Sequence, residues 1–184
     1  MAGAAEGRVT GQPRVAIRPV AEADAGAIAG IYAHHVTHGT ATFDTQAPTV
    51  EQWREKITHL AAHGWPFLVA TDEDDAVIGY AYAAQFRDRP AYAHACEDSV
   101  YVHPERIGRG VGKALLAALI PAAGAAGFTQ MLGVIAGGED ASVALHAGQG
   151  FRHAGRMEKV GYKFGQWLDT IYMQRALQAD EQTH

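Results

Sequence analysis

The sequence has a single cysteine, Cys96, so the chain cannot form an internal disulfide. This use of cysteine favours a reducing compartment, and we expect a cytoplasmic protein. No apolar run reaches the length of a membrane span, and Met1 to Gly11 lack the apolar core of a signal peptide. The 15 Lys and Arg are outnumbered by 20 Asp and Glu, which gives no electrostatic reason for nucleic acid or an anionic membrane as a partner.

The histidines do not follow a metal-binding pattern. His59 and His63 are four residues apart on an expected helix, and His34 and His35 are adjacent. Neither pair has a flanking glutamate or a third ligand at a useful spacing, and there is no cluster of thiolates. We therefore expect no metal site.

The 184 residues are enough for one domain with a substantial core. Apolar and aromatic runs predict strands at 15–19, 67–70, 77–86, around Val100, and at 131–135, 155–162 and 167–173. Helical spacing predicts helices after Asp24 and Thr49 and over 113–120 and 142–146. This order predicts a single α/β domain at 13–177 with a mixed central sheet, and flexible tails at 1–12 and 178–184.

Capping residues and a proline are expected to set three helix ends. Asp24 is predicted to cap the first helix, and Thr49 to cap the second together with Gln52, three residues further on. Pro121 is predicted to end or kink the third helix near its last turn, because proline lacks the N–H that the helix needs.

The most informative stretch runs from Glu97 to Lys113. A short strand passes through a proline into a turn with Gly108, Gly110 and Gly112, and a helix follows at once. Glycines let main chain approach a ligand closely, and a helix start presents unpaired N–H groups to an anion. The pattern predicts a diphosphate site, although glycines alone can simply join a strand to a helix. The spacing does not fit a Walker loop, and a dinucleotide fingerprint does not fit because the turn lies deep in the chain and its helix is not the first.

Three motifs in one order extend this pattern: 97–102 (Glu-Asp-Ser-Val-Tyr-Val), 142–146 (Ser-Val-Ala-Leu-His) and 161–169 (Gly-Tyr-Lys-Phe-Gly-Gln-Trp-Leu-Asp). With them, the chain resembles the GNAT superfamily of N-acetyltransferases, and within it the phosphinothricin and methionine-sulfone acetyltransferases. The resemblance covers roughly 17–177. It implies the GNAT fold, a central mixed sheet flanked by helices, with acetyl-CoA as co-substrate and a homodimer as the typical assembly.

The resemblance also implies a cofactor site. Backbone of the strand pairs with the pantetheine amides, and N–H groups of the turn meet the diphosphate. Two positions depart from the family pattern: Ile107 stands where Gln or Arg is usual, and Glu139 where Asn is usual. The expected cofactor-binding residues are Val100, Tyr101, Val102, Ile107, Gly108, Arg109, Gly110, Val111, Gly112, Lys113 and Glu139.

Two residues are candidates for catalysis. An α-amine is largely protonated at pH 7 and must lose a proton to react, and the resemblance places the family's catalytic glutamate at Glu97. His146 falls where many GNAT enzymes carry a tyrosine that protonates the departing thiolate. An imidazole there can be an acid, a contact of the cofactor or the substrate, or a structural histidine, and these alternatives stay open.

Four further residues match substrate-contact positions of the family: Phe43, Arg87, Arg89 and Tyr92. The arginines can hold a carboxylate with paired N–H donors, and Phe43 would form a wall of the pocket. The alternative is that the segment from Arg87 to Tyr92 is a solvated, charged loop.

These residues predict an N-acetyltransferase acting directly on the α-amine of a small amino-acid analogue. Cys96 neighbours Glu97 on a strand, so its side chain is expected to face the opposite way and to take no part. One alternative acceptor is a protein N-terminus or a polyamine. A different class of protein, a non-catalytic acyl-CoA-binding module, is the other alternative.

Overall fold

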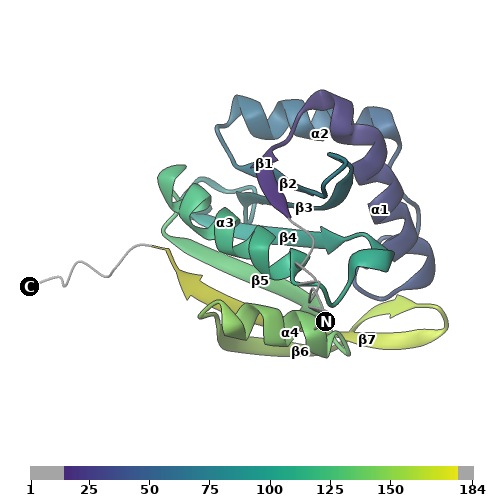
Figure 1. Cartoon of the computed structure of the whole chain (residues 1–184). Helices are drawn as coiled ribbons and strands as arrows, with labels where there is room; N and C mark the ends of the chain where they lie inside the picture. The colour runs from purple at the N-terminus through teal and green to yellow at the C-terminus, as the bar shows by residue number, and fades with distance from the viewer. Residues whose placement is uncertain (1–14, 178–184) are drawn as a thin grey trace, which may run out of the picture.

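Seven strands form one mixed sheet in the computed structural model, which describes residues 15–177 (Figure 1). The order is β1-β2-β3-β4-β5-β7-β6, and only β4 and β5 run parallel. The predicted α/β fold with a mixed central sheet is therefore confirmed, while the expected tails at 1–12 and 178–184 lie outside the described residues. The bounds are β1 (Ala16–Pro19), α1 (Ala25–His38), α2 (Val50–Ala62), β2 (Phe67–Thr71), β3 (Val77–Gln85), β4 (Ala95–Val102), α3 (Val111–Ala125), β5 (Gln130–Ala136), α4 (Asp140–Gly148), β6 (Arg152–Lys163) and β7 (Gln166–Ala176).

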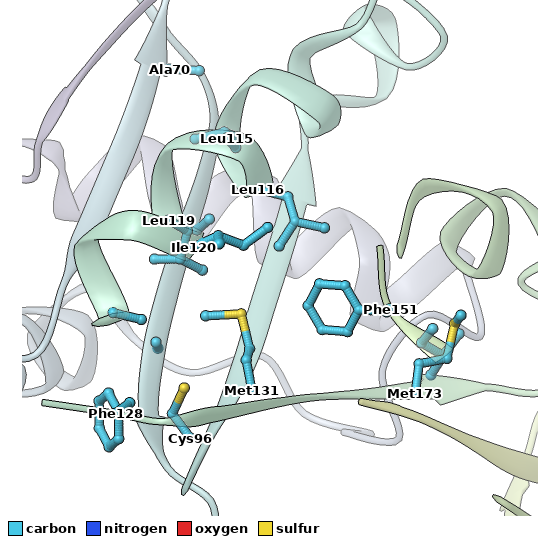
Figure 2. Packing of buried hydrophobic residues seen from close by; sticks show 14 of the residues in the cluster. Ala70, Cys96, Leu115, Leu116, Leu119, Ile120, Phe128, Met131, Phe151 and Met173 are labelled. Carbon is cyan, nitrogen blue, oxygen red and sulfur yellow. The ribbon is translucent and has the colours of Figure 1, made fainter. Parts of the chain in front are cut away.

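Helices cover both faces of the sheet, and alternate strand residues point to each face. Ala81 and Cys96 lie in the cluster formed with α3, whereas Val69 and Tyr80 lie in the cluster formed with α1 and α2. Figure 2 shows leucines of α3 and Met131 of β5 in the first cluster. Within 15–177, no helix has the length and apolar character to cross a membrane.

A glycine in β3 lets α3 lie close to the sheet. A Cβ atom at Gly79 would stand 3.1 Å from Leu115 Cδ1, from Val111 Cγ1 and from the carbonyl oxygen of Tyr101. Such contacts are tighter than ordinary van der Waals distances, so any side chain here would push α3 away. The glycine thereby sets the position of the N-terminal turn of α3.

The helix boundaries support one capping prediction and correct another. Thr49 and Gln52 form the expected capping box at the start of α2. Asp24 lies at the predicted helix start, but its side chain does not cap α1. Its carboxylate instead accepts hydrogen bonds from the Arg18 guanidinium and the Ala21 N–H. The prediction was wrong because a 3-10 turn (Glu22–Asp24) precedes α1 and takes this carboxylate for its own start.

Pro121 was predicted to end or kink the third helix near its last turn, and the prediction of an end was wrong. Helix α3 continues through the proline to Ala125. Proline removes one backbone hydrogen bond, but Leu119, Ile120 and Ala123 on either side are buried. Tertiary packing of this apolar face offsets the loss.

Candidate active site

Strands β4 and β5 start as parallel neighbours and then part. Their pairing covers 95–98 with 130–133, and the last pair is Asp98 with Gly133. Beyond it, β4 stays paired with β3 up to Val102, and β5 stays paired with β7 up to Ala136. The two strands therefore open a cleft in the middle of the sheet, with unpaired backbone on both walls.

A cavity of about 410 Å³ fills this cleft and extends to the glycine turn and α4. The N–H of His103 donates to Ile78 on β3, and backbone groups alternate in direction along a strand. The N–H and C=O of Val100 and the N–H of Val102 therefore face the cleft without a partner among the described residues, while the Val102 carbonyl accepts from His35 of α1 at 2.9 Å. These are the groups that an amide-containing chain needs in order to bind as an extra strand.

The glycine turn lies at one end of the cavity. Gly108 and Gly110 have φ values of 77° and 81°, a left-handed conformation that glycine adopts without strain. Gly110 is the N-cap of α3 and has no side chain that could cap the helix. The first helical hydrogen bond comes from the N–H of Ala114 to Gly110, so the three preceding N–H groups have no partner within the helix. This end of the cavity can bind an anion.

A second cavity, of about 280 Å³, meets the first at Glu97. It lies on the α1 and α2 face of the sheet and is lined by Tyr32, Phe43 and Tyr82, among others. Both cavities share Glu97, Ser99 and Tyr101 of β4. Two ligands in these cavities would therefore come together beside the Glu97 carboxylate.

Burial raises the pKa of Glu97 to about 6, and the neighbouring Asp98 carboxylate adds to the shift. Arg87 and Lys56 act in the opposite direction, so both cations lie within electrostatic range of Glu97. A carboxylate with this pKa is ionised at pH 7 and is a stronger base than an ordinary glutamate.

His146 forms a buried pair with Asp98 at the point where the strands part. Its Nε2 lies 2.9 Å from Asp98 Oδ2, and its Nδ1 donates to the Ser142 carbonyl at 2.7 Å. Burial lowers the pKa of His146, but the hydrogen bond and charge of Asp98 outweigh burial and raise it overall. Gly133 provides the space, because a Cβ atom there would stand 2.7 Å from the His146 ring. Both ring nitrogens of His146 are thus engaged inside the protein.

The motif at 161–169 holds the loop between α1 and α2 in place. Gly161 lies against Phe43, and a Cβ atom at 161 would stand 2.5 Å from that ring. The buried Lys163 donates to the Thr42 carbonyl at 2.7 Å, which brings the loop to the second cavity. On the other side, Thr40 donates to the Glu139 carboxylate at 2.8 Å.

Most of the expected site residues lie together. The expected cofactor-binding residues line the first cavity with the exception of the exposed Arg109, and Glu97 and His146 line it too. Phe43 lines the second cavity. Arg87, Arg89 and Tyr92 line neither, although Arg87 acts on the pKa of Glu97.

Sequence reasoning missed Lys56, Tyr82, Asp98 and His35. His35 donates from α1 to the Val102 carbonyl at 2.9 Å and lines the first cavity. Two signals were available: Lys56 lies on the apolar face of its helix, and Asp98 alternates with Cys96 and Val100. A charged residue on an expected buried face indicates a partner or a function. Within 15–177, no group of three or more metal-ligating side chains is placed to hold a metal ion.

Known proteins are similar to this chain in sequence and in fold. The family described as "Acetyltransferase (GNAT) domain" matches residues 17–172. A phosphinothricin N-acetyltransferase of Alcaligenes faecalis is 43% identical over 168 residues, which cover 91% of this chain and 85% of that protein. An L-methionine sulfoximine/L-methionine sulfone acetyltransferase of Pseudomonas aeruginosa is 37% identical, over 86% of this chain and 92% of that protein.

A solved structure agrees with this comparison. The phosphinothricin acetyltransferase of Sinorhizobium meliloti, in complex with acetyl-CoA, has a TM-score of 0.86 and 43% identity, over 88% of each chain. The chain therefore belongs to the GNAT acetyltransferase family. It is an acetyl-CoA-dependent N-acetyltransferase, and the opened strand edge with the uncapped helix start fits a ligand that has both amide and diphosphate groups.

Proposed function

We propose that this enzyme acetylates the α-amine of a small amino-acid analogue of the phosphinothricin, methionine sulfone or methionine sulfoximine type. The observation that carries the proposal is the meeting of the two cavities at the half-buried Glu97. One cavity suits an elongated, anionic cofactor, and the smaller one suits a small acceptor. The names of the relatives support the class of acceptor.

Acetyl-CoA supplies the acetyl group as a reactive thioester. We propose that Val100, Val102 and the N–H groups of the turn from Ile107 to Lys113 hold it, and that Glu139 and Tyr101 line its path. Backbone N–H groups of β4 would polarise the thioester carbonyl. Arg109 would act at the exposed rim of the turn.

Glu97 would be the general base. It takes a proton from the ammonium group of the acceptor, so that a neutral amine forms the new N–C bond as the C–S bond breaks. The nitrogen loses its second proton as the amide forms, and the leaving thiolate takes up this proton to give CoA–SH. We give His146 an electrostatic and positioning role in this step, because both of its ring nitrogens already form hydrogen bonds with Asp98 and Ser142.

Arg87, Arg89 and Tyr92 are proposed to hold the acceptor, with Phe43 as a wall of its cavity. The effect of Arg87 on the pKa of Glu97 supports a place for its guanidinium next to the α-carboxylate of the acceptor. This carboxylate lies one carbon from the amine that Glu97 would deprotonate.

A thioester-cleavage assay tests the proposed function. Methionine sulfone, methionine sulfoximine and phosphinothricin are offered with acetyl-CoA, and release of CoA is expected with at least one of them. Faster release with a polyamine or an N-terminal peptide would contradict the proposed acceptor. Tight acetyl-CoA binding by calorimetry without CoA release from any amine would indicate a non-catalytic binding module.

Direct transfer predicts that Cys96→Ala retains its turnover to within about threefold, because no acyl-enzyme forms on the thiol. Cys96 is fully buried and faces the α3 cluster, and burial raises the pKa of its thiol to about 12. The measurement is the steady-state rate, with circular dichroism to compare folding. Loss of turnover in a folded variant would contradict direct transfer.

We also propose a homodimer formed through the hairpin of β6 and β7. Five exposed large apolar side chains lie on this hairpin: Met157, Val160, Tyr162, Phe164 and Trp167. Such a patch favours a protein partner. Sedimentation is expected to give twice the chain mass, and Trp167→Ser to shift the protein toward monomer; a monomeric unaltered protein would contradict the proposal.

The cytoplasmic location also stays a prediction, supported by the single cysteine.

A further inference from the structure

Lys56 is a half-buried cation without a carboxylate partner. It lies on α2 between Trp53 and Leu60, on the face that packs against the sheet. Its Nζ donates to the Tyr82 hydroxyl at 2.5 Å and lies 4.2 Å from the centre of the Tyr82 ring and 5.2 Å from that of Trp53. Among the ion pairs formed by residues 15–177, none includes Lys56.

The ammonium group of Lys56 lies where the second cavity, here called the acceptor cavity, adjoins a further cavity. Lys56 and Trp53 line a cavity of about 360 Å³ that shares Tyr32 with the acceptor cavity, and Tyr82 lines the acceptor cavity itself. Asp44, which also lines the Lys56 cavity, already accepts a hydrogen bond from the Tyr32 hydroxyl at 2.7 Å. Lys56 lowers the pKa of Glu97, so its charge reaches the base.

The surroundings of Lys56 leave donors for a ligand. An ammonium group has three N–H donors, and Tyr82 accepts from one of them. The two aromatic rings attract the positive charge but provide no lone pairs in the ring plane for the remaining N–H groups. Oxygen atoms of an anion fit these remaining donors best.

We propose that Lys56 binds a negatively charged oxyacid group at the side-chain end of the acceptor. This inference rests on the proposed function and makes its substrate class narrower. Arg87 comes shortly after the end of β3, where Ala84 pairs with Glu97, whereas Lys56 lines the adjoining cavity. Arg87 therefore suits the α-carboxylate next to the reacting amine. Lys56 then suits an anion further along the side chain. The phosphinate of phosphinothricin is such an anion, whereas the sulfone of methionine sulfone is neutral.

The test compares the two acceptors in Lys56→Met, which keeps the length of the side chain and removes its charge. We expect kcat/KM for phosphinothricin to fall about 10- to 100-fold, mainly through KM, and kcat/KM for methionine sulfone to change by less than about threefold. Lys56→Arg should recover most of the loss with phosphinothricin. Arg54→Met is the control, because Arg54 is a cation of the same helix that pairs with the exposed Glu51. Arg54→Met should leave kcat/KM for both acceptors unchanged.

The outcomes separate this inference from the proposed function. If the unaltered enzyme acetylates neither acceptor, the proposed function is wrong, and the inference is wrong with it. A different outcome is an active enzyme in which Lys56→Met lowers kcat/KM equally for both acceptors, or for neither of them. In that case the charge of Lys56 does not recognise the side chain of the acceptor, and this inference alone is overturned. Unfolding by urea checks that Lys56→Met and Lys56→Arg are equally folded.

Discussion

Replacing Glu97 with glutamine is expected to lower turnover by about 100-fold or more, without loss of affinity for acetyl-CoA. The amide cannot take a proton, but it keeps the size of the carboxylate at the junction of the two cavities. Steady-state rates measure the turnover and calorimetry measures the affinity. Glu73→Gln, in the exposed turn between β2 and β3, is the control and should be unchanged. Near-normal turnover in Glu97→Gln would remove this residue from the role of base.

The same residue predicts the pH dependence of the reaction. Burial and Asp98 raise the pKa of Glu97 to about 6, so the carboxylate is ionised above this value and protonated below it. The base is active when ionised, so kcat/KM should fall roughly tenfold per pH unit as the pH drops below about 6. A titration of kcat/KM from pH 5 to 8 should show this limb in the unaltered enzyme, and the limb should be absent from Glu97→Gln. A limb that survives in the variant would belong to another group.

Replacing Asp98 with alanine is expected to lower the free energy of unfolding by about 3 to 5 kcal/mol. The change leaves the His146 side chain buried without its partner, at a position where only 4% of the residue is exposed. Urea unfolding measures the loss. Asp74→Ala, on an exposed turn, is the control and should stay within about 0.5 kcal/mol of the unaltered protein. A loss below about 1 kcal/mol for Asp98→Ala would show that the pair contributes little.

The pH dependence of this loss has a definite direction. The folded protein raises the pKa of His146 above its ordinary value. The stability from the pair is therefore fully present below the ordinary pKa of histidine, and it is lost as the pH rises through the raised value. The difference in unfolding free energy between the unaltered protein and Asp98→Ala should shrink over that window.

Local patterns in the sequence were sufficient for the fold class and for the glycine turn that lines the first cavity. The turn from Ile107 to Gly112 follows a strand directly and precedes a helix, so its glycines and the N–H groups of the helix start are neighbours in the chain. Such local geometry depends on residues a few positions apart. The same holds for the capping box of Thr49 and Gln52.

Other parts of both cavities depended on contacts between distant residues. Lys56 meets Tyr82 across 26 positions, and Asp98 meets His146 across 48. Lys56 and Asp98 each stand out as a charge on an apolar face, but the identity of the partner follows from which elements lie side by side. The position of Pro121 inside α3 was mispredicted for a related reason, since the packing of the helix on the sheet outweighs the local preference of proline.

The sequence by itself determined that this protein has an α/β fold, with a glycine turn between a strand and a helix and a carboxylate at the head of that strand. These features are local, because they depend on strand periodicity, glycine conformations and a helix start. Only the tertiary structure decided that β4 and β5 part after Asp98, and that a second cavity reaches Glu97 from the other face of the sheet. The parting of two strands depends on what packs between and behind them, here the Asp98–His146 pair beside Gly133, and these three residues come from separate elements.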